Sequence, residues 1–402
     1  MSRGARIRLL ALVCSLLLAF AGASASQAAQ RSPLAKRLAS ALSTSGAAWE
    51  RSGALVVDLT TARTIYAQNP WASLVPASNE KLAVTYAALS ILGPSYRIET
   101  TVLGHGRLLG STWRGDLFLR GRGDPSLDSA ALGELARQLS EAGVTAVSGG
   151  VVGDETYFDS RRTAYGWKPE FYVNESPPIS ALSVNRTTAA EPALGTTIAF
   201  REALRAAGVR VAGAPRLGRT PPGAWPLASV LSPPMRDLVR AMDTDSDNYT
   251  AELLIKQLGA VVARRGTTPA GAAVVTGALK AAGIPLRGVR IVDGSGLSRL
   301  DRLTPGAIVG LLRAAFADPL VRPSFVAALP VAGRTGTLAS RLRGTAARGR
   351  VAAKTGTTNL ASALSGFVSS RYAFAILQNG NPVAHSEARA SQDRFVAILA
   401  AQ

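Results

Sequence analysis

The chain has 402 residues, with 45 Lys and Arg against 26 Asp and Glu, and a formal charge of +19 at pH 7. Its hydrophobic content of 47% excludes a disordered chain and provides core enough for about two domains. The one cysteine, Cys14, lies in an N-terminal apolar segment, and the chain has only two histidines. These counts exclude thiol catalysis, cysteine-bound metal and a histidine-rich metal site from the mature protein, and leave Lys, Asp, Glu or Tyr as the base for any proton transfer.

Residues 1–25 have the order of a secretory signal peptide. Arg3, Arg6 and Arg8 precede an apolar run over residues 9–20, and Ala-Ser-Ala at 23–25 offers small residues for cleavage. The run is too short for a comfortable membrane span, and no later stretch reaches that length. We therefore expect an exported protein of the periplasm, cell wall or medium, with an uncleaved anchor as the alternative. Cleavage leaves 377 residues with a charge of +16. That charge favours anionic envelope polymers, but a general preference for Arg, at 39 of the 45 basic residues, explains it at least as well.

The N-terminal part of the mature chain is predicted to contain a helix, two strands and a second helix. Residues 26–48 form the first helix, and residues 53–58 and 63–67 form strands around the turn at 59–61. Residues 82–92 are apolar on nearly every side, which predicts a buried central helix that ends at Gly93-Pro94. Ser78 then lies at the N-terminal end of this helix.

The middle and C-terminal parts predict an inserted α+β module followed by helices and strands. The module covers residues 97–227, with strands at 115–119 and 144–152 and helices at 129–142 and 197–207. Helices follow at 235–242 and 249–258, the second ending at Gly259, with a turn at 243–248. Three strands at 350–356, 361–369 and 371–378 and a helix at 391–401 complete the chain. We expect the two N-terminal and three C-terminal strands to form one antiparallel sheet with helices packed on it.

Three short motifs carry the candidate chemistry: Ser-Asn-Glu-Lys at 78–81, Ser-Asp-Asn at 246–248 and Lys-Thr-Gly-Thr at 354–357. In a helix, residues i and i+3 are neighbours, so Ser78 Oγ and Lys81 Nζ can meet. An apolar helix desolvates Lys81, which lowers the pKa of a lysine and lets the neutral amine take the serine proton. The helix N-terminus also offers N–H groups to an oxyanion. A serine at a helix start followed by a surface lysine is the simpler alternative for this motif alone.

The second and third motifs are also weak in isolation. A turn between helices can direct Ser246 and Asn248 into one cleft, although the same residue types form a helix cap before Tyr249. Lys354, Thr355 and Gly356 at a strand provide a cation, a hydroxyl and close backbone approach, which suit a carboxylate ligand. The three motifs in this order, each on the required element, are far less common by chance than any one of them.

The three motifs together resemble the active-site set of the serine penicillin-recognising enzymes. The segments 76–81, 123–127, 181–186, 246–252 and 293–298 are similar to those of the class C low-molecular-mass penicillin-binding proteins, D-alanyl-D-alanine carboxypeptidase/endopeptidases of the S13 peptidase family. The resemblance covers nearly the whole mature chain. It implies an α/β (α+β) fold in which a discontinuous transpeptidase/β-lactamase-like domain, residues 31–96 and 228–402, has a five-stranded antiparallel sheet and a helical subdomain. An inserted α+β domain, residues 97–227, interrupts it.

The resemblance also implies a role for each motif residue. Ser78 would be the nucleophile, Lys81 its general base, Ser246 the proton shuttle and Asn248 a contact to the substrate backbone. The terminal carboxylate of the substrate would lie against Lys354, Thr355, Gly356 and Thr357, and the N–H groups of Ser78 and Thr357 would form the oxyanion hole. Peptidoglycan stem peptides would be the substrates, β-lactams would acylate Ser78, and no metal or organic cofactor would be needed.

Two further residues resemble a family pair that would grip the zwitterionic end of a diaminopimelate side chain. These are Asp154 and Arg299, for which a turn residue and a surface arginine are equally good interpretations. The chain departs from the family at Asp301, where Asn is frequent, and at Thr335, where an acid is more usual. The insert is also shorter than in long members, which predicts the absence of a third domain.

Competing functions are a β-lactamase and a catalytically weak wall-binding protein. Class C β-lactamases carry Tyr-x-Asn at the second motif, and class A enzymes lack so large an insert after the first motif. A catalytically dead member is expected to have lost a motif residue, and all are present here. Export and an aromatic content of 6% argue against nucleic-acid binding. The final helix has no basic amphipathic extension, so we predict no C-terminal membrane anchor. The sequence leaves carboxypeptidase and endopeptidase activity both open.

Overall fold

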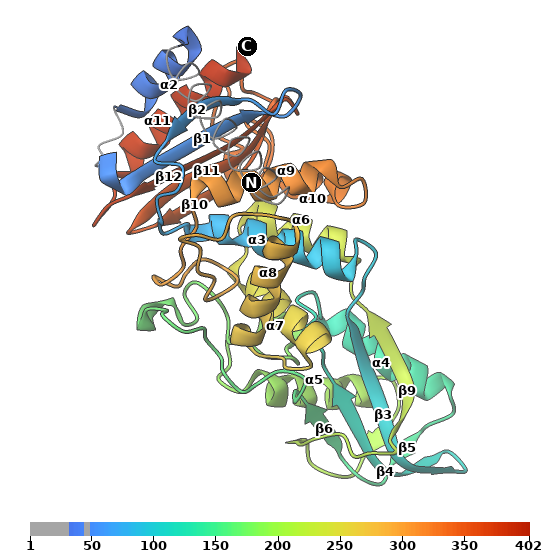
Figure 1. Cartoon of the computed structure of the whole chain (residues 1–402). Helices are drawn as coiled ribbons and strands as arrows, with labels where there is room; N and C mark the ends of the chain where they lie inside the picture. Colours follow the sequence, from blue (N-terminus) through green and yellow to red (C-terminus); the bar gives the residue numbers. More distant parts are fainter. Residues whose placement is uncertain (1–31, 44–48) are drawn as a thin grey trace, which may run out of the picture.

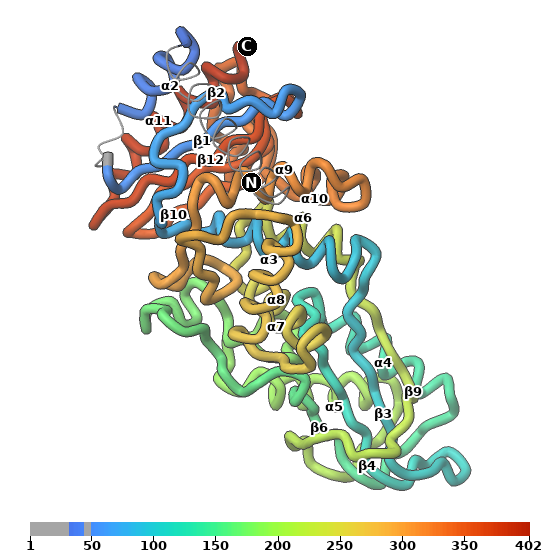
Figure 2. Tube along the Cα trace, viewed as in Figure 1, coloured from blue at the N-terminus to red at the C-terminus, as the bar shows by residue number. Residues whose placement is uncertain are grey.

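A computed structural model describes residues 32–43 and 49–402. The predicted signal peptide lies outside these residues, and the predicted first helix is described only as α2 (Pro33–Ser43). The chain forms two sheet-based lobes joined by a group of helices, as the trace in Figure 2 shows. None of the described helices is both long and apolar enough to span a membrane.

The first sheet combines both ends of the described chain. Its strand order is β10 (Val351–Thr358), β11 (Ala361–Val368), β12 (Tyr372–Asn379), β1 (Ser52–Asp58) and β2 (Thr64–Gln68). Every neighbouring pair is antiparallel. The predicted five-stranded antiparallel sheet is therefore confirmed. β11 is buried along its whole length, because helices cover both faces of the sheet.

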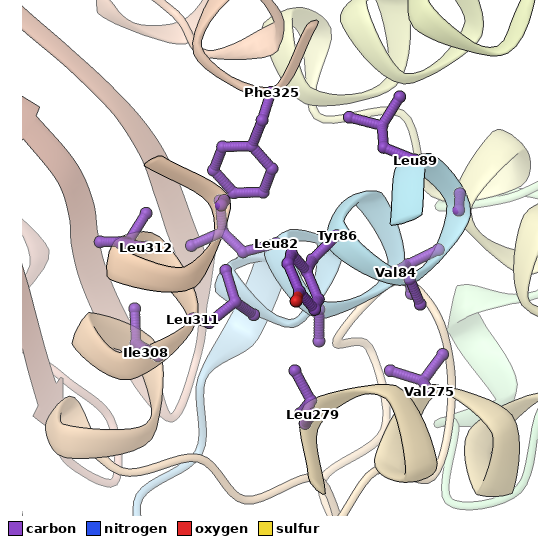
Figure 3. Close-up of a cluster of buried hydrophobic side chains, with 14 of the residues drawn as sticks. Leu82, Val84, Tyr86, Leu89, Val275, Leu279, Ile308, Leu311, Leu312 and Phe325 are labelled. Carbon is purple, nitrogen blue, oxygen red and sulfur yellow. The ribbon is translucent and has the colours of Figure 1, made fainter. Parts of the chain in front are cut away.

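Helices on the two faces of this sheet explain its uniform burial (Figure 1). α2 packs with α11 (His385–Ala400) on one face. The other face contacts α9 (Pro305–Ala317), behind which α3 (Lys81–Ala87) is buried at every residue and continues as a π-helical turn over Ala88–Leu92. Figure 3 shows α3 side chains such as Leu82 among Leu311 and Phe325. The helices α6 (Met235–Asp245), α7 (Asn248–Ala263), α8 (Thr268–Ala281) and α10 (Arg322–Ala328) complete this core.

The second sheet is built from the middle of the chain. Its order is β7 (Arg210–Val211), β5 (Ala146–Val147), β4 (Thr112–Arg120), β3 (Glu99–Leu109) and β9 (Trp225–Leu231), with β6 (Val151–Asp154) pairing β4 and β8 (Arg216–Leu217). α4 (Ser129–Glu141) and α5 (Pro192–Ala206) pack on it around a separate core. This mixed sheet with its own core is an α+β unit, and β9 extends past residue 227.

Several predicted element bounds are wrong; the final helix, predicted over 391–401, is α11 and begins at His385. α7 does not end at Gly259 but continues to Ala263. A Cβ at Gly259 would lie 2.7 Å from Arg265 O, so this glycine serves close packing of the following segment. α5 begins at Pro192, which is favourable at a helix start because its missing N–H needs no partner there. The predicted strand 144–152 is two short strands, β5 and β6.

Candidate active site

Ser78 and Lys81 meet at the start of the buried helix α3. Residues Ala77–Glu80 form a 3-10 turn that leads directly into α3. This geometry brings positions i and i+3 together, and Lys81 Nζ lies 3.0 Å from Ser78 Oγ. Ala77 has a left-handed φ of 48°, a conformation that is costly for a residue with a side chain. The neighbouring residues hold this strained turn in place, and the turn positions Ser78 at the N-terminal end of the helix.

Lys81 is completely buried, and its amine is held on three sides. Besides Ser78, it lies 2.7 Å from Asn248 Oδ1 and 2.7 Å from the carbonyl oxygen of Ser295. Burial lowers the pKa of Lys81 to about 8, although carboxyl groups led by Asp293 oppose this shift. A useful fraction of the amine is therefore neutral near neutral pH, and a neutral amine can accept the Ser78 proton.

The second motif is the turn between α6 and α7. Ser246 ends α6 in the left-handed conformation, with φ 61°. Asp247 caps α7 by accepting from the N–H groups of Tyr249 and Thr250 at 3.3 and 3.2 Å. The motif therefore both caps the helix and directs side chains into a cleft, and different residues do each. Asp247 serves the helix, while its two neighbours face the lysines of the first and third motifs.

The third motif lies on β10, beside the first. Lys354 is completely buried and its Nζ lies 2.8 Å from Ser246 Oγ. Burial, and then repulsion by Lys81, lower the pKa of Lys354 to about 7. A Cβ at Gly356 would lie 2.8 Å from Pro76 O, so a glycine is what allows β10 to lie against the Ser78 turn.

Hydroxyl groups and amides extend this network at its edges. Thr355 Oγ1 lies 2.8 Å from Thr337 Oγ1, and Arg389 Nη2 lies 3.4 Å from Thr357 Oγ1. Asn79 Nδ2 donates to the carbonyl oxygen of Lys354 at 3.1 Å, which ties the first motif to the third. Thr335, a departure from the family, accepts from the N–H of Val331 at 2.9 Å and so supports its own loop.

A group of buried acids lies behind Lys81, and sequence reasoning did not find it. We call Glu80, Glu252, Asp293 and Asp301 the carboxyl cluster; all four are completely buried. Asp293 accepts from Trp167 Nε1, Gly296 N and Ser298 N at 2.7–2.8 Å. In the sequence, Asp301 is a departure from the family, and the other three acids lie in segments that resemble the family but have no role assigned to them.

Burial and the neighbouring carboxyl groups favour the neutral form of the other three acids of the carboxyl cluster. Burial, reinforced by the charge of Asp293, raises the pKa of Glu252 to about 8 and those of Glu80 and Asp301 well above their usual range. Each has at least one buried oxygen with no partner among the described residues. Glu252 Oε1 nevertheless accepts from Gly294 N and Ser295 N at 3.0 and 2.8 Å, and so holds the loop whose carbonyl binds Lys81.

The predicted pair Asp154 and Arg299 is not brought together, because the two residues line different cavities. Arg299 lines a cavity of about 840 Å³ with Arg161 and Trp167. Asp154 lines another, in the middle lobe, and its two oxygens each accept an N–H and a hydroxyl, from Thr156 and Thr220, at 2.6–2.9 Å. A carboxylate with all four hydrogen bonds satisfied inside the protein is not free to hold a ligand amine.

Comparisons with known proteins agree with this arrangement. The sequence model of the D-Ala-D-Ala carboxypeptidase 3 (S13) family matches residues 34–194 and 186–402. The chain is 33% identical to the D-alanyl-D-alanine carboxypeptidase of Actinomadura sp. (strain R39), over 82% of this chain and 78% of that protein. It is 31% identical to a carboxypeptidase of Mycobacterium tuberculosis, over 79% of this chain and 72% of that protein.

Solved structures show the same fold at lower identity. Penicillin binding protein 4 from Haemophilus influenzae is 21% identical and superposes with a TM-score of 0.81, over 90% of this chain and 98% of that one. A predatory peptidoglycan endopeptidase from Bdellovibrio bacteriovorus is 18% identical, with a TM-score of 0.54 over 82% of this chain and 86% of that one. The family model matches the chain from residue 34 onwards, and the serines, lysines and asparagine of the three motifs lie together in the structure. The chain therefore belongs to the D-Ala-D-Ala carboxypeptidase 3 (S13) family.

Proposed function

We propose that this chain is an exported serine D-Ala-D-Ala carboxypeptidase, with endopeptidase activity on D-Ala cross-links, that acts on peptidoglycan stem peptides. The observation that carries the proposal is Ser78 Oγ at 3.0 Å from the amine of a buried lysine whose pKa is lowered to about 8. The N-terminal signal pattern supports export, and the curated relatives are carboxypeptidases.

Acylation begins when neutral Lys81 takes the proton of Ser78. The freed Oγ attacks the carbonyl carbon of the penultimate D-Ala, and the N–H groups of Ser78 and Thr357 stabilise the oxyanion that forms. Ser246 passes the proton that Lys81 took to the departing amine, so the C–N bond breaks and D-Ala, or the amine of the cross-linked peptide, leaves. Lys81 is then neutral again and takes a proton from a water that attacks the acyl carbon. The bond to Ser78 Oγ breaks, Lys81 returns that proton to Ser78, and the shortened peptide leaves with a new carboxylate.

The other motif residues bind and orient the substrate. Lys354, Thr355 and Thr357 hold the terminal carboxylate, which also raises the fraction of charged Lys354 in the complex because an anion favours the ammonium form. Asn248 holds the substrate backbone. In the free protein its Nδ2 donates at 2.9 Å to the carbonyl oxygen of Glu175, in the long segment between β6 and α5. A bound peptide carbonyl replaces this contact.

The cavity beside Arg299 receives the side chain of the stem peptide. It lies next to a narrow space that reaches Thr358, the last residue of β10. Arg299 and Arg161 give it positive charge for the carboxylate at the free end of a diamino acid, and Trp167 provides an apolar wall. This replaces the predicted pairing of Arg299 with Asp154.

The direct test is labelling of the mature protein with a fluorescent penicillin, followed by mass spectrometry of the labelled peptide. We expect a label on Ser78 that persists for minutes and is absent in Ser78→Ala. Rapid penicillin turnover without lasting label would instead identify a β-lactamase. A folded protein that is not acylated would leave only wall binding without catalysis.

A further inference from the structure

A second cavity lies far from Ser78, where the middle lobe meets the end of α7. It has a volume of about 670 Å³. Its walls come from β3, β4 and β6, from the loop 219–224, and from the residues that follow the last turns of α7. α7 begins at Asn248 in the active site, and sixteen residues at about 1.5 Å each place its other end about 24 Å away. This cavity therefore cannot receive the peptide bond that Ser78 attacks.

Three arginines from three separate segments line this cavity: Arg120 on β4, Arg219 in the loop, and Arg264 after α7. None of them makes an ion pair with an acid of the described residues. Unpaired arginines that converge on a concavity are a ready site for an anion, because each guanidinium can present two parallel N–H donors to phosphate oxygens.

The one carboxylate among the lining residues offsets only one of the three arginine charges. Asp154 is held by Thr156 and Thr220 through four hydrogen bonds, and these outweigh burial and lower its pKa. Three guanidinium groups and one carboxylate leave a formal charge of about +2, which matches a phosphate better than a single carboxylate. The C-terminal carbonyls of α7 reduce this field only by a partial charge.

The remaining walls suit a saccharide next to the anion. Tyr157, Leu103 and the Pro221-Pro222 pair present rings and aliphatic carbon to the cavity. Apolar faces beside a few polar groups are the usual lining of a small-molecule site. We propose that this cavity binds a phosphate-bearing saccharide of the cell envelope, at a second site about 24 Å from the active serine. Phosphate binding at this cavity does not depend on catalysis at Ser78. That the bound saccharide holds the enzyme on the wall polymer rests on the proposed function.

The test is titration calorimetry of the mature protein with glucose 1-phosphate at low ionic strength, with glucuronate as the carboxylate probe. We compare Arg219→Gln/Arg264→Gln with Arg107→Gln/Arg114→Gln. Both pairs remove two exposed arginines, but the second pair lies opposite each other on the β3–β4 hairpin, outside the cavity. We expect the cavity pair to weaken binding at least tenfold and the hairpin pair to leave it within about twofold.

Equal losses in the two variants would overturn the site, because they would show general attraction to a basic protein. Glucuronate binding as tight as glucose 1-phosphate would overturn the phosphate assignment. Penicillin labelling of Ser78 in each variant reports folding. If the wild type binds glucose 1-phosphate but is not labelled, the anion site stands and the proposed function fails. If the wild type is labelled by penicillin but does not bind glucose 1-phosphate, the proposed function stands and the anion site fails.

Discussion

At the scale of single residues, Ser78 and Lys81 come from one short segment of the chain. The spacing of Ser78 and Lys81 follows from local helix geometry, and their 3.0 Å contact agrees with it. The carboxyl cluster was not predictable in this way. Its four acids come from different segments, and nothing in the sequence around Glu80 or Glu252 shows that the side chain is buried. Burial depends on contacts between distant segments.

The lowered pKa of Lys81 predicts a rising pH profile for acylation. Only the neutral amine can take the Ser78 proton, and its fraction grows about tenfold per pH unit below the pKa. With a pKa of about 8, the acylation rate constant at saturating penicillin should rise steeply from pH 6 and level off above pH 8. Rapid-mixing measurements from pH 6 to 9 test this. A flat profile would mean that Lys81 is not the base.

Asp301→Asn is predicted to stabilise the protein, increasingly so as the pH rises. The folded-state pKa of Asp301 is raised by burial and by Asp293, so above its unfolded value, about 3.9, the unfolded chain loses a proton that the folded chain keeps. Stability then falls with rising pH up to the folded pKa. Asn needs no proton, and its oxygen can accept from Val292 N as Asp301 does at 2.7 Å.

Thermal unfolding at pH 5 and pH 8 measures this effect. We expect the melting temperature of Asp301→Asn to exceed that of wild type by about 2 °C or more at pH 8, and by less at pH 5. An advantage that is larger at pH 5 would contradict a raised pKa at this position.

At the scale of elements, a glycine can either allow close packing or simply occupy an open position, and the sequence alone cannot distinguish the two. Gly356 allows contact between β10 and the Ser78 turn, where a Cβ would lie 2.8 Å from Pro76 O and 3.2 Å from Ala77 Cβ. At Gly277, on the exposed side of α8, an added Cβ would have no other atom within 4 Å. The sequence shows a glycine at both positions, but it does not show which atoms lie where a side chain would be.

These two glycines give opposite predictions. Gly356→Ala should push β10 away from Ser78 and reduce the penicillin acylation rate at least tenfold, because small displacements of reacting groups are costly. Gly277→Ala should leave acylation unchanged and add about 0.5–1 kcal/mol of stability, since alanine loses less freedom in a helix. Acylation kinetics and denaturant unfolding of both variants check this pair. Normal acylation by Gly356→Ala would refute the close-approach role.

Across the whole molecule, an ion pair between a buried lysine and a partly exposed aspartate joins the helical core to the middle segment. Lys256 on α7 is completely buried and bonds Asp159, and its Nζ also donates to Arg161 O at 2.9 Å. The five-stranded sheet was predictable from strand patterns at both ends of the chain. This cross-connection was not, because a lysine in a helix of mixed composition is expected on the surface.

Lys256→Met is predicted to lower the free energy of unfolding by about 1–3 kcal/mol, since it leaves the partly exposed Asp159 carboxylate without its charged partner. The double variant Lys256→Met/Asp159→Asn should recover most of this loss, because no unpaired charge remains. Urea unfolding followed by tryptophan fluorescence measures both. A double variant as unstable as the single one would show that Lys256 acts through packing of its aliphatic chain instead.

The pairing of β1 with β12 also determines when the enzyme can become active. Ser52 lies opposite Gln378, so the central strands of the sheet join residues more than 300 positions apart. β10, which carries Lys354, is held in this sheet only through β11 and β12. During synthesis, a chain that still lacks its last strands can neither close the sheet nor place Lys354 beside Ser246. With the proposed export, the site would therefore remain unassembled while the last strands have still to cross the membrane, and activity on the proposed substrate would begin only once they have crossed.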